Sequence, residues 1–188
     1  MSSGLGGIFM SKNKRSLSNP RVLACSALFI ALSIVCGKYL KIPVGDILRF
    51  SFENLPIILS GIMFGPVCAA IVALLADILG CVLVGYAINP IVTLGAVAIG
   101  LISGFISKPA NKLPLSLRLA LTVFTSHLIG SVLIKTFGLS QWYDISLPVL
   151  MLWRLLNYVI VGIVEYLLLY LLLSRYTFIK QMNSIIGE

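Results

Sequence analysis

Charged side chains are scarce in this sequence. Of its 188 residues, 11% are charged and only six are Asp or Glu, whereas 59% are apolar and the mean hydropathy is +1.06. Water-soluble domains are closer to ~45–50% apolar and ~25% charged. These proportions exclude a water-soluble globular protein and predict a chain whose solvent is the lipid bilayer.

Motifs for catalysis and nucleotide binding are also missing. The sequence contains no GxxxxGK[ST], no HExxH and no GxSxG, so neither a P-loop ATPase nor these hydrolases are indicated. The acidic residues are scattered, the single histidine, His127, has no neighbouring ligand cluster, and the four cysteines form no CxxC pair. The sequence therefore predicts no enzyme, no metal site and no cofactor.

What the sequence does contain is a series of apolar segments separated by polar, Gly- or Pro-containing breaks. Because ~20 helical residues cross a hydrocarbon core ~30 Å thick, a chain of this length allows six short-looped spans. We predict an all-α integral membrane bundle over residues 20–176, preceded by a disordered basic N-terminus (1–19) and followed by a cytoplasmic tail (177–188). The expected spans are residues 21–37, 52–64, 67–84, 91–106, 115–137 and 148–173.

Lys and Arg are distributed unevenly between the two sides of this bundle. Cytoplasmic loops carry an excess of both residues, and these basic clusters lack the aromatic interleaving of single-strand nucleic-acid binders. We therefore expect both termini to be cytoplasmic, in a bacterial cytoplasmic membrane, and no nucleic-acid partner. With the N-terminus inside, the inner side holds Lys12, Lys14, Arg15, Arg21, Lys108, Lys112, Arg118, Arg175 and Lys180, against Lys38, Lys41, Arg49 and Lys135 outside.

Residues 49–56, RFSFENLP, combine a cation, an anion, an amide and two aromatic rings at the start of the second apolar segment. Polar groups at such a position are costly unless they are paired or bind something. One interpretation is a ligand site that includes Arg49 and Phe52. The other, equally weighted, is an interfacial helix start in which Arg49 pairs with Glu53 four positions on.

Two further spans carry polar residues at membrane depth. Asp77 lies within the third span, where it must face the interior; it either contacts a ligand or pairs with Arg154 or His127. Beyond its outer end, Tyr86 and Asn89 adjoin Pro90. Turn chemistry alone explains Asn89, although an aromatic ring and an amide over a pocket would also suit a flat heteroaromatic ligand.

The fifth and sixth spans each present a polar stripe. In the sixth, Asn157 is too deep to reach the surface and needs a hydrogen-bond partner, whereas Arg154 is partly explained by snorkelling. In the fifth, the default interpretation is a satisfied core histidine and a surface cation at Lys135, which would also attract an anionic ligand. Trp142 belongs to the expected outer aromatic belt. The stripes comprise Arg154, Asn157, Tyr158, Val161 and Glu165 in one span, and Ala120, Phe124, His127, Ser131 and Lys135 in the other.

Small residues recur at helical spacing in the first span, at Ala24, Ala27 and Ala31. Such faces allow helix backbones to approach closely, so we expect a packing face here. The pairs Gly61/Gly65 and Gly100/Gly104 indicate the same, most simply packing within this protein.

Taken together, these segments resemble the substrate-binding S components of energy-coupling factor vitamin transporters. The resemblance runs from about Pro20 to Tyr176 and rests on the basic N-terminus, the Ala27-xxx-Ala31 face, Gly65-Pro66 and the segment 75–80, LADILG. RFSFENLP together with SGIMFGP at 60–66 looks most like the folate-specific members.

The resemblance implies a bundle that captures a vitamin on the extracellular side. It also implies association, through the alanine face, with a separate transmembrane coupling protein and two ABC ATPases, which would supply the energy. Two alternatives remain: an S component for another vitamin, such as riboflavin or pantothenate, and a stand-alone proton-coupled secondary transporter using Asp77, His127 and Glu165.

For folate, residue type and depth suggest roles for the candidate residues. A pterin ring would accept or donate hydrogen bonds to Asp77 or Asn157 and stack on an aromatic side chain, and the glutamate carboxylates would meet a cation near the mouth. The substrate-binding candidates are Arg49, Phe52, Asp77, Tyr86, Asn89, Lys135, Trp142, Arg154 and Asn157, and the partner-interface candidates are Ala24, Ala27 and Ala31.

Overall fold

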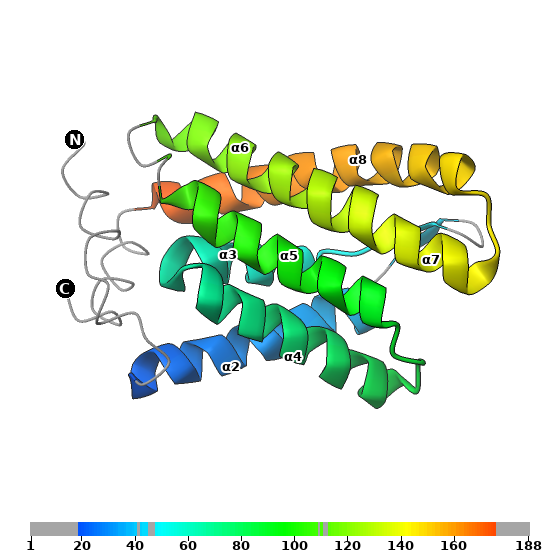
Figure 1. Ribbon diagram of the computed structural model, residues 1–188. Helices are drawn as coiled ribbons and strands as arrows, with labels where there is room; N and C mark the ends of the chain where they lie inside the picture. The colour runs from blue at the N-terminus through cyan, green and yellow to red at the C-terminus, as the bar shows by residue number, and fades with distance from the viewer. Residues whose placement is uncertain (1–18, 41, 45–47, 109, 111–112, 176–188) are drawn as a thin grey trace.

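The computed structural model describes residues 19–40, 42–44, 48–108, 110 and 113–175. Almost all of the predicted N-terminal segment and the whole predicted tail lie outside these residues. The described chain is a bundle of roughly aligned helices (Figure 1), with π-helical segments labelled η. In chain order the elements are α2 (Pro20–Ile34), η2 (Val35–Tyr39), β1 (Ile42–Val44), β2 (Leu48–Phe50), α3 (Asn54–Phe64), α4 (Pro66–Val84), α5 (Pro90–Ser107), α6 (Leu115–Ser126), η4 (His127–Lys135), α7 (Thr136–Tyr143) and α8 (Leu147–Ser174).

Five helical stretches among the described residues are long and apolar enough to cross a bilayer: residues 20–39, 66–84, 90–107, 115–143 and 147–174. The predicted multi-pass helical bundle is confirmed. The second predicted span differs, because α3 has only 11 residues. At 1.5 Å per residue it measures about 16 Å and does not cross a core of ~30 Å by itself.

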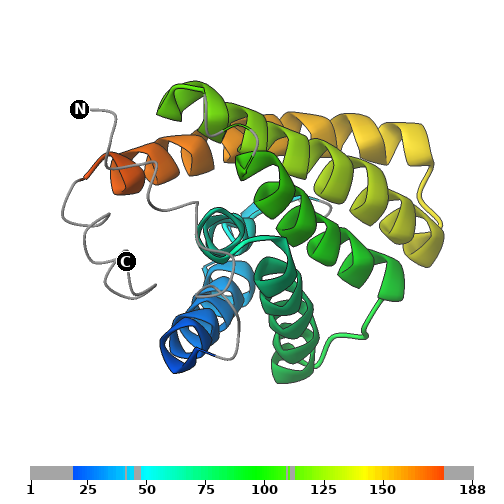
Figure 2. The same cartoon turned by 60° about the vertical axis from the view of Figure 1, so that its left-hand side comes forward.

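Helix α3 is the centre of the bundle. Ten of its 11 residues are buried, and it contacts α2, α4, α5, α6 and α8. Figure 2 shows it nearly end-on between the first helices of the chain and the α5–α8 group. Because α3 begins part-way through the bundle, the space beyond its N-terminus is open to side chains from the surrounding helices.

Glycine allows close contact at two places around α3. Gly65, at φ 93°, forms the turn between α3 and α4, in a backbone conformation that other residues rarely adopt. A Cβ on Gly100 would lie 2.5 Å from the carbonyl oxygen of Ala69, so its absence lets α5 pack directly on α4. The Gly100/Gly104 motif therefore serves packing within this chain.

Two features differ from the sequence expectation. The segment between the first two apolar stretches, expected to be a loop, contains a short antiparallel hairpin in which β1 pairs with β2 and Pro43 lies opposite Arg49. The fifth span is one continuous stretch of α6, η4 and α7, with a nine-residue π-helix in its middle. π-helical turns are rare and frequently occur at functional sites, and this one carries His127 and Lys135.

Candidate ligand-binding site

A cavity of about 430 Å³ lies beyond the N-terminus of α3. This volume falls within the ~300–1,000 Å³ of typical small-molecule sites. Its walls come from η2, the end of α4, the start of α5, η4, α7 and α8. Seven of the sequence candidates line it: Asp77, Tyr86, Asn89, Lys135, Trp142, Arg154 and Asn157.

The two remaining substrate candidates are placed differently. Phe52 is half-buried and is not among the residues that line the cavity. Arg49 lies in β2, where the structure describes the backbone but not the side chain. The lining also includes Lys38, Glu53 and Tyr158, which the sequence analysis did not select as binding residues.

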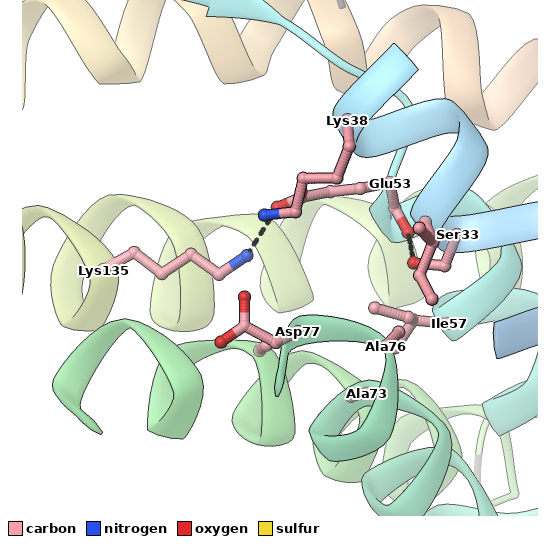
Figure 3. A pocket seen from close by; sticks show the side chains of 10 residues that line it. Ser33, Lys38, Glu53, Ile57, Ala73, Ala76, Asp77 and Lys135 are labelled. Carbon is pink, nitrogen blue, oxygen red and sulfur yellow. Dashed lines mark hydrogen bonds and ion pairs between the residues drawn. The ribbon is translucent and has the colours of Figure 1, made fainter. Parts of the chain in front are cut away.

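An ion pair forms the floor of the cavity. Lys135 Nζ donates to Glu53 Oε1 at 2.8 Å, and Lys135 is 3% exposed. Below it is a space of only about 10 Å³, room for little more than one water. Figure 3 shows the pair there, with Ser33 donating to the backbone carbonyl of Glu53. The expectation of a surface cation at Lys135 is therefore wrong. The other expectation, an Arg49–Glu53 pair, involves a side chain outside the described part of the structure.

Glu53 precedes α3 and lies outside the membrane-spanning helices. Burial by itself would raise the pKa of its carboxyl group, but the positive charges of Lys135, Lys38 and Arg154 outweigh burial and lower the pKa to about 2. The side chain is therefore an anion at any physiological pH.

Asp77 projects from α4 into the same space as Lys135 (Figure 3). Its Oδ2 accepts a hydrogen bond from Thr93 Oγ1 at 2.6 Å, which links α4 to α5. Within the described part of the chain it forms no ion pair with Arg154 or His127, so both partners suggested by the sequence are wrong. One face of the carboxylate remains directed at the cavity.

Lys38 reaches the cavity from η2. Its Nζ lies 3.8 Å from Cys81 Sγ and 5.9 Å from the centre of the Tyr86 ring. No carboxylate is within 4.0 Å of this cation among the described residues. In the sequence, Lys38 counted only as a topology signal because it sits at the end of an apolar segment.

Arg154 occupies the α8 wall. Its Nη2 donates to Tyr158 Oη at 3.2 Å and to the Ser131 carbonyl at 3.4 Å, whereas its buried Nε has no hydrogen-bond partner in the described structure. Across the same residues, no carboxylate lies within 4.0 Å of the guanidinium. Arg154 is thus a cavity-lining cation with free donor capacity.

The mouth of the cavity is aromatic. Tyr86 is 41% exposed and Trp142 is 52% exposed, so both present ring faces at the rim. Asn89 also lies here, but its side chain is engaged: Oδ1 caps α5 by accepting from the backbone N–H groups of Ile91 and Val92, and Nδ2 donates to the Gly138 carbonyl at 3.0 Å. Its role in the structure is to tie the start of α5 to α7.

Among the described residues, the charged side chains lining the cavity are three cations, Lys38, Lys135 and Arg154, and two anions, Glu53 and Asp77. One cation is neutralised by a direct ion pair, which leaves Lys38 and Arg154 without a described acidic partner in contact. A ligand that combines an anionic group with a flat, hydrogen-bonding ring would complement these walls.

A model of the family described as "ECF transporter, substrate-specific component" matches residues 21–178. The chain belongs to this family. One similar solved structure is described as "Crystal structure of FolT bound with folic acid". Its chain is 26% identical in sequence to this S component, and the TM-score is 0.66. The match covers 79% of this chain and 90% of that one. The helical membrane bundle predicted from the sequence is the fold of that protein.

A curated relative is similar over a shorter stretch. The folate transporter FolT of Clostridium novyi (strain NT) is 41% identical to this S component over 59 residues. Those residues are 31% of this chain and 34% of that protein, so the match spans about a third of the relative's length.

Proposed function

We propose that this S component binds folate in the cavity beyond α3. The observation that carries the proposal is Arg154, a cation at the cavity wall with a buried Nε that lacks a partner among the described residues. Folate pairs a planar pterin with a carboxylate-bearing tail, which matches two cations without an acidic partner in contact among the described residues, Lys38 and Arg154, together with the Asp77 carboxylate and an aromatic rim. The similarity to FolT supports the same ligand.

The proposed binding mode follows from the hydrogen-bonding groups, rings and charges of the side chains that line the cavity. Asp77 accepts one hydrogen bond, from Thr93, and has capacity to accept another from the pterin ring. Asn157 lines the cavity on the opposite wall. Tyr86 and Trp142 stack on the ring system. Because Lys135 is already bound to Glu53, the tail carboxylates meet Arg154, with Lys38 and Arg49 as further cations.

Transport requires partners in this proposal. Ala24, Ala27 and Ala31 are all exposed on α2, which gives a shallow face suited to close helix contact. A transmembrane coupling protein would dock here, together with two ABC ATPases. The protein would lie in a bacterial cytoplasmic membrane with both termini in the cytoplasm, so that the cavity opens to the outside.

The proposal is tested by titrating the purified, detergent-solubilised protein with folate, riboflavin and pantothenate in a calorimeter. We expect binding of folate alone. Arg154→Ala should weaken it by about 10- to 100-fold, because a hydrogen bond to a charged group contributes ~1.5–3 kcal/mol.

The matched control is Arg175→Ala, at the exposed far end of the same helix, which should leave folate affinity unchanged. If the wild-type protein does not bind folate, or if Arg154→Ala binds it as tightly as wild type does, the proposal fails. Preferential binding of riboflavin or pantothenate would instead assign the cavity to that vitamin.

A further inference from the structure

A second contact between two ionisable side chains lies deeper in the bundle, and neither residue lines the cavity. His127, the first residue of η4, faces Glu165 of α8 with Nε2 and Oε2 2.6 Å apart. Their side chains are 2% and 0% exposed. Burying two ionisable groups is costly even when they are paired, and folate binding as described above uses neither. Their role therefore needs a separate explanation.

The contacts of His127 lead to Arg154. The imidazole stacks on the Tyr158 ring, with centroids 5.1 Å apart and planes at 27°, and its Nδ1 is 3.4 Å from Ser131 Oγ. Tyr158 and Ser131 are also the two residues that accept hydrogen bonds from Arg154 Nη2. The Tyr158 ring, one of the two supports of the guanidinium, therefore rests directly against the imidazole. The other support is the backbone carbonyl of Ser131, whose side-chain hydroxyl faces Nδ1.

Glu165 determines how that imidazole is held. The carboxylate accepts a hydrogen bond from Nε2–H, which fixes the ring orientation and leaves Nδ1 for the Ser131 hydroxyl. Without the carboxylate, only the longer contact to the Ser131 hydroxyl and the stack on Tyr158 would restrict rotation of the ring about the Cβ–Cγ bond.

We propose that His127 and Glu165 are positioning residues that hold the Tyr158 ring, and through it the Arg154 guanidinium, in the orientation that receives the anionic end of the ligand. This inference rests on the folate-binding proposal and assigns the buried pair a role in specificity. The pair acts on the part of the ligand that carries charge and leaves the pterin end alone.

The test compares two ligands: folate, and 6-hydroxymethylpterin, which has the ring but no carboxylate. Glu165→Gln keeps the size of the side chain and removes its charge. We expect it to weaken folate binding about 5- to 20-fold and to leave the pterin affinity within twofold. In an Arg154→Ala background, Glu165→Gln should have no further effect on folate, because the group it positions is gone.

A purely structural role for the pair would weaken both ligands equally, or would add to the effect of Arg154→Ala; either result overturns the inference. Thr122→Ala is the matched control. Thr122 is a buried polar residue of α6 that hydrogen-bonds within its own helix, to the Arg118 carbonyl. Thr122→Ala should change the affinity for neither folate nor 6-hydroxymethylpterin.

A readout without ligand separates this inference from the folate proposal. His127 is the only histidine in the sequence, so ¹⁵N-histidine labelling of protein carrying a histidine-free tag gives one imidazole in the NMR spectrum. Arg154→Ala should shift both ring-nitrogen signals, and Arg175→Ala should not. If wild-type protein fails to bind folate but Arg154→Ala shifts the signals, the folate proposal alone is wrong; unshifted signals overturn the coupling.

Discussion

The floor of the cavity depends on two residues that lie 82 positions apart in the chain, Glu53 and Lys135. Their ion pair joins the start of the central helix to the π-helical part of the fifth span. Since Lys135 is almost fully buried, removing only Glu53 would leave a buried ammonium group without its partner. Such unpaired buried charges destabilise proteins by ~3–5 kcal/mol.

Glu53→Gln should therefore lower the melting temperature of the detergent-solubilised protein, with a loss of about 3 kcal/mol as the order of magnitude. Glu53→Gln/Lys135→Met should be less destabilised than the sum of the two single variants, because it leaves neither charge buried alone. Differential scanning fluorimetry of the four proteins measures this cycle. Strictly additive shifts would show that the two side chains do not interact.

The sign of the pH dependence follows from the lowered pKa of Glu53. A carboxyl group with a folded-state pKa of about 2 stabilises the fold fully above its unfolded value of ~4.3 and loses that contribution as the pH falls toward 2. Wild type and Glu53→Gln should thus differ by a constant amount between pH 6 and 8. Melting curves in that range check this, and a difference that shrinks between pH 8 and 6 would contradict it.

Residue types predicted several of the charged side chains that line the cavity, but not which of the charged side chains form ion pairs. Asp77, Lys135 and Arg154 were selected because charge within an apolar helix indicates an interior role, and all three line the cavity. Helix pairing rules consider neighbours three or four positions away, so they offer Arg49 as one partner for Glu53 and give no indication of Lys135, which is 82 positions away. Lys38 lies at the end of a span. Hydropathy does not indicate whether a cation at such a position faces water, lipid headgroups or the interior of the bundle.

Among the elements, α3 and α5 show most clearly what hydropathy can and cannot predict. Span limits were predicted within two residues, except that the fifth span continues to Tyr143 instead of ending at Phe137, because apolar length is a local property. The shortness of α3, which leaves space for the cavity, depends on where the chain becomes extended before Asn54, and the π-helix depends on packing. Neither has a pattern in the sequence, whereas the Gly100/Gly104 spacing did indicate close helix contact.

Gly100→Ala should destabilise the bundle by about 1–3 kcal/mol, the usual effect of overpacking a dense core, because the new methyl group would meet the backbone of Ala69. Gly162→Ala, the control, meets side chains and no backbone: its Cβ would lie 3.2 Å from the Phe124 ring, which is 38% exposed, and at an ordinary contact distance of 3.6 Å from His127 Cδ2. Thermal melting in detergent should separate the two variants. Equal melting temperatures would mean that α5 can shift away from α4.

The exposed alanine face of α2 is the proposed docking surface for the coupling protein. Ala27→Trp places a large ring where the coupling protein is proposed to dock, so we expect co-purification with that protein and its ATPases to fall at least tenfold while folate binding stays unchanged. Leu167→Trp, at a 50% exposed position of α8, is the control for a large exposed ring elsewhere. If Ala27→Trp retains its partners, docking uses another face.

For the molecule as a whole, the two acids that a stand-alone proton-coupled transporter would use each have a hydrogen-bond partner. Glu165 is bound to His127 and Asp77 accepts from Thr93. A secondary transporter also commonly needs two structural repeats that rock about the binding site, and the sequence has no evident internal repeat. These features favour the proposed binding subunit with a separate coupling protein over a stand-alone transporter.

Proteoliposomes containing this chain alone should consequently take up no folate, whether a proton gradient or internal ATP is supplied. Adding the coupling protein and both ATPases should give ATP-dependent uptake. In that complete complex, Arg154→Ala should reduce uptake at folate concentrations below the wild-type Kd. At saturating folate the reduction should be smaller, because the substitution weakens folate binding and leaves the coupling protein and ATPases intact. Proton-driven accumulation by the chain alone would require a route through Asp77 or the His127–Glu165 pair, and the positioning role assigned to that pair would then have to give way to proton transfer.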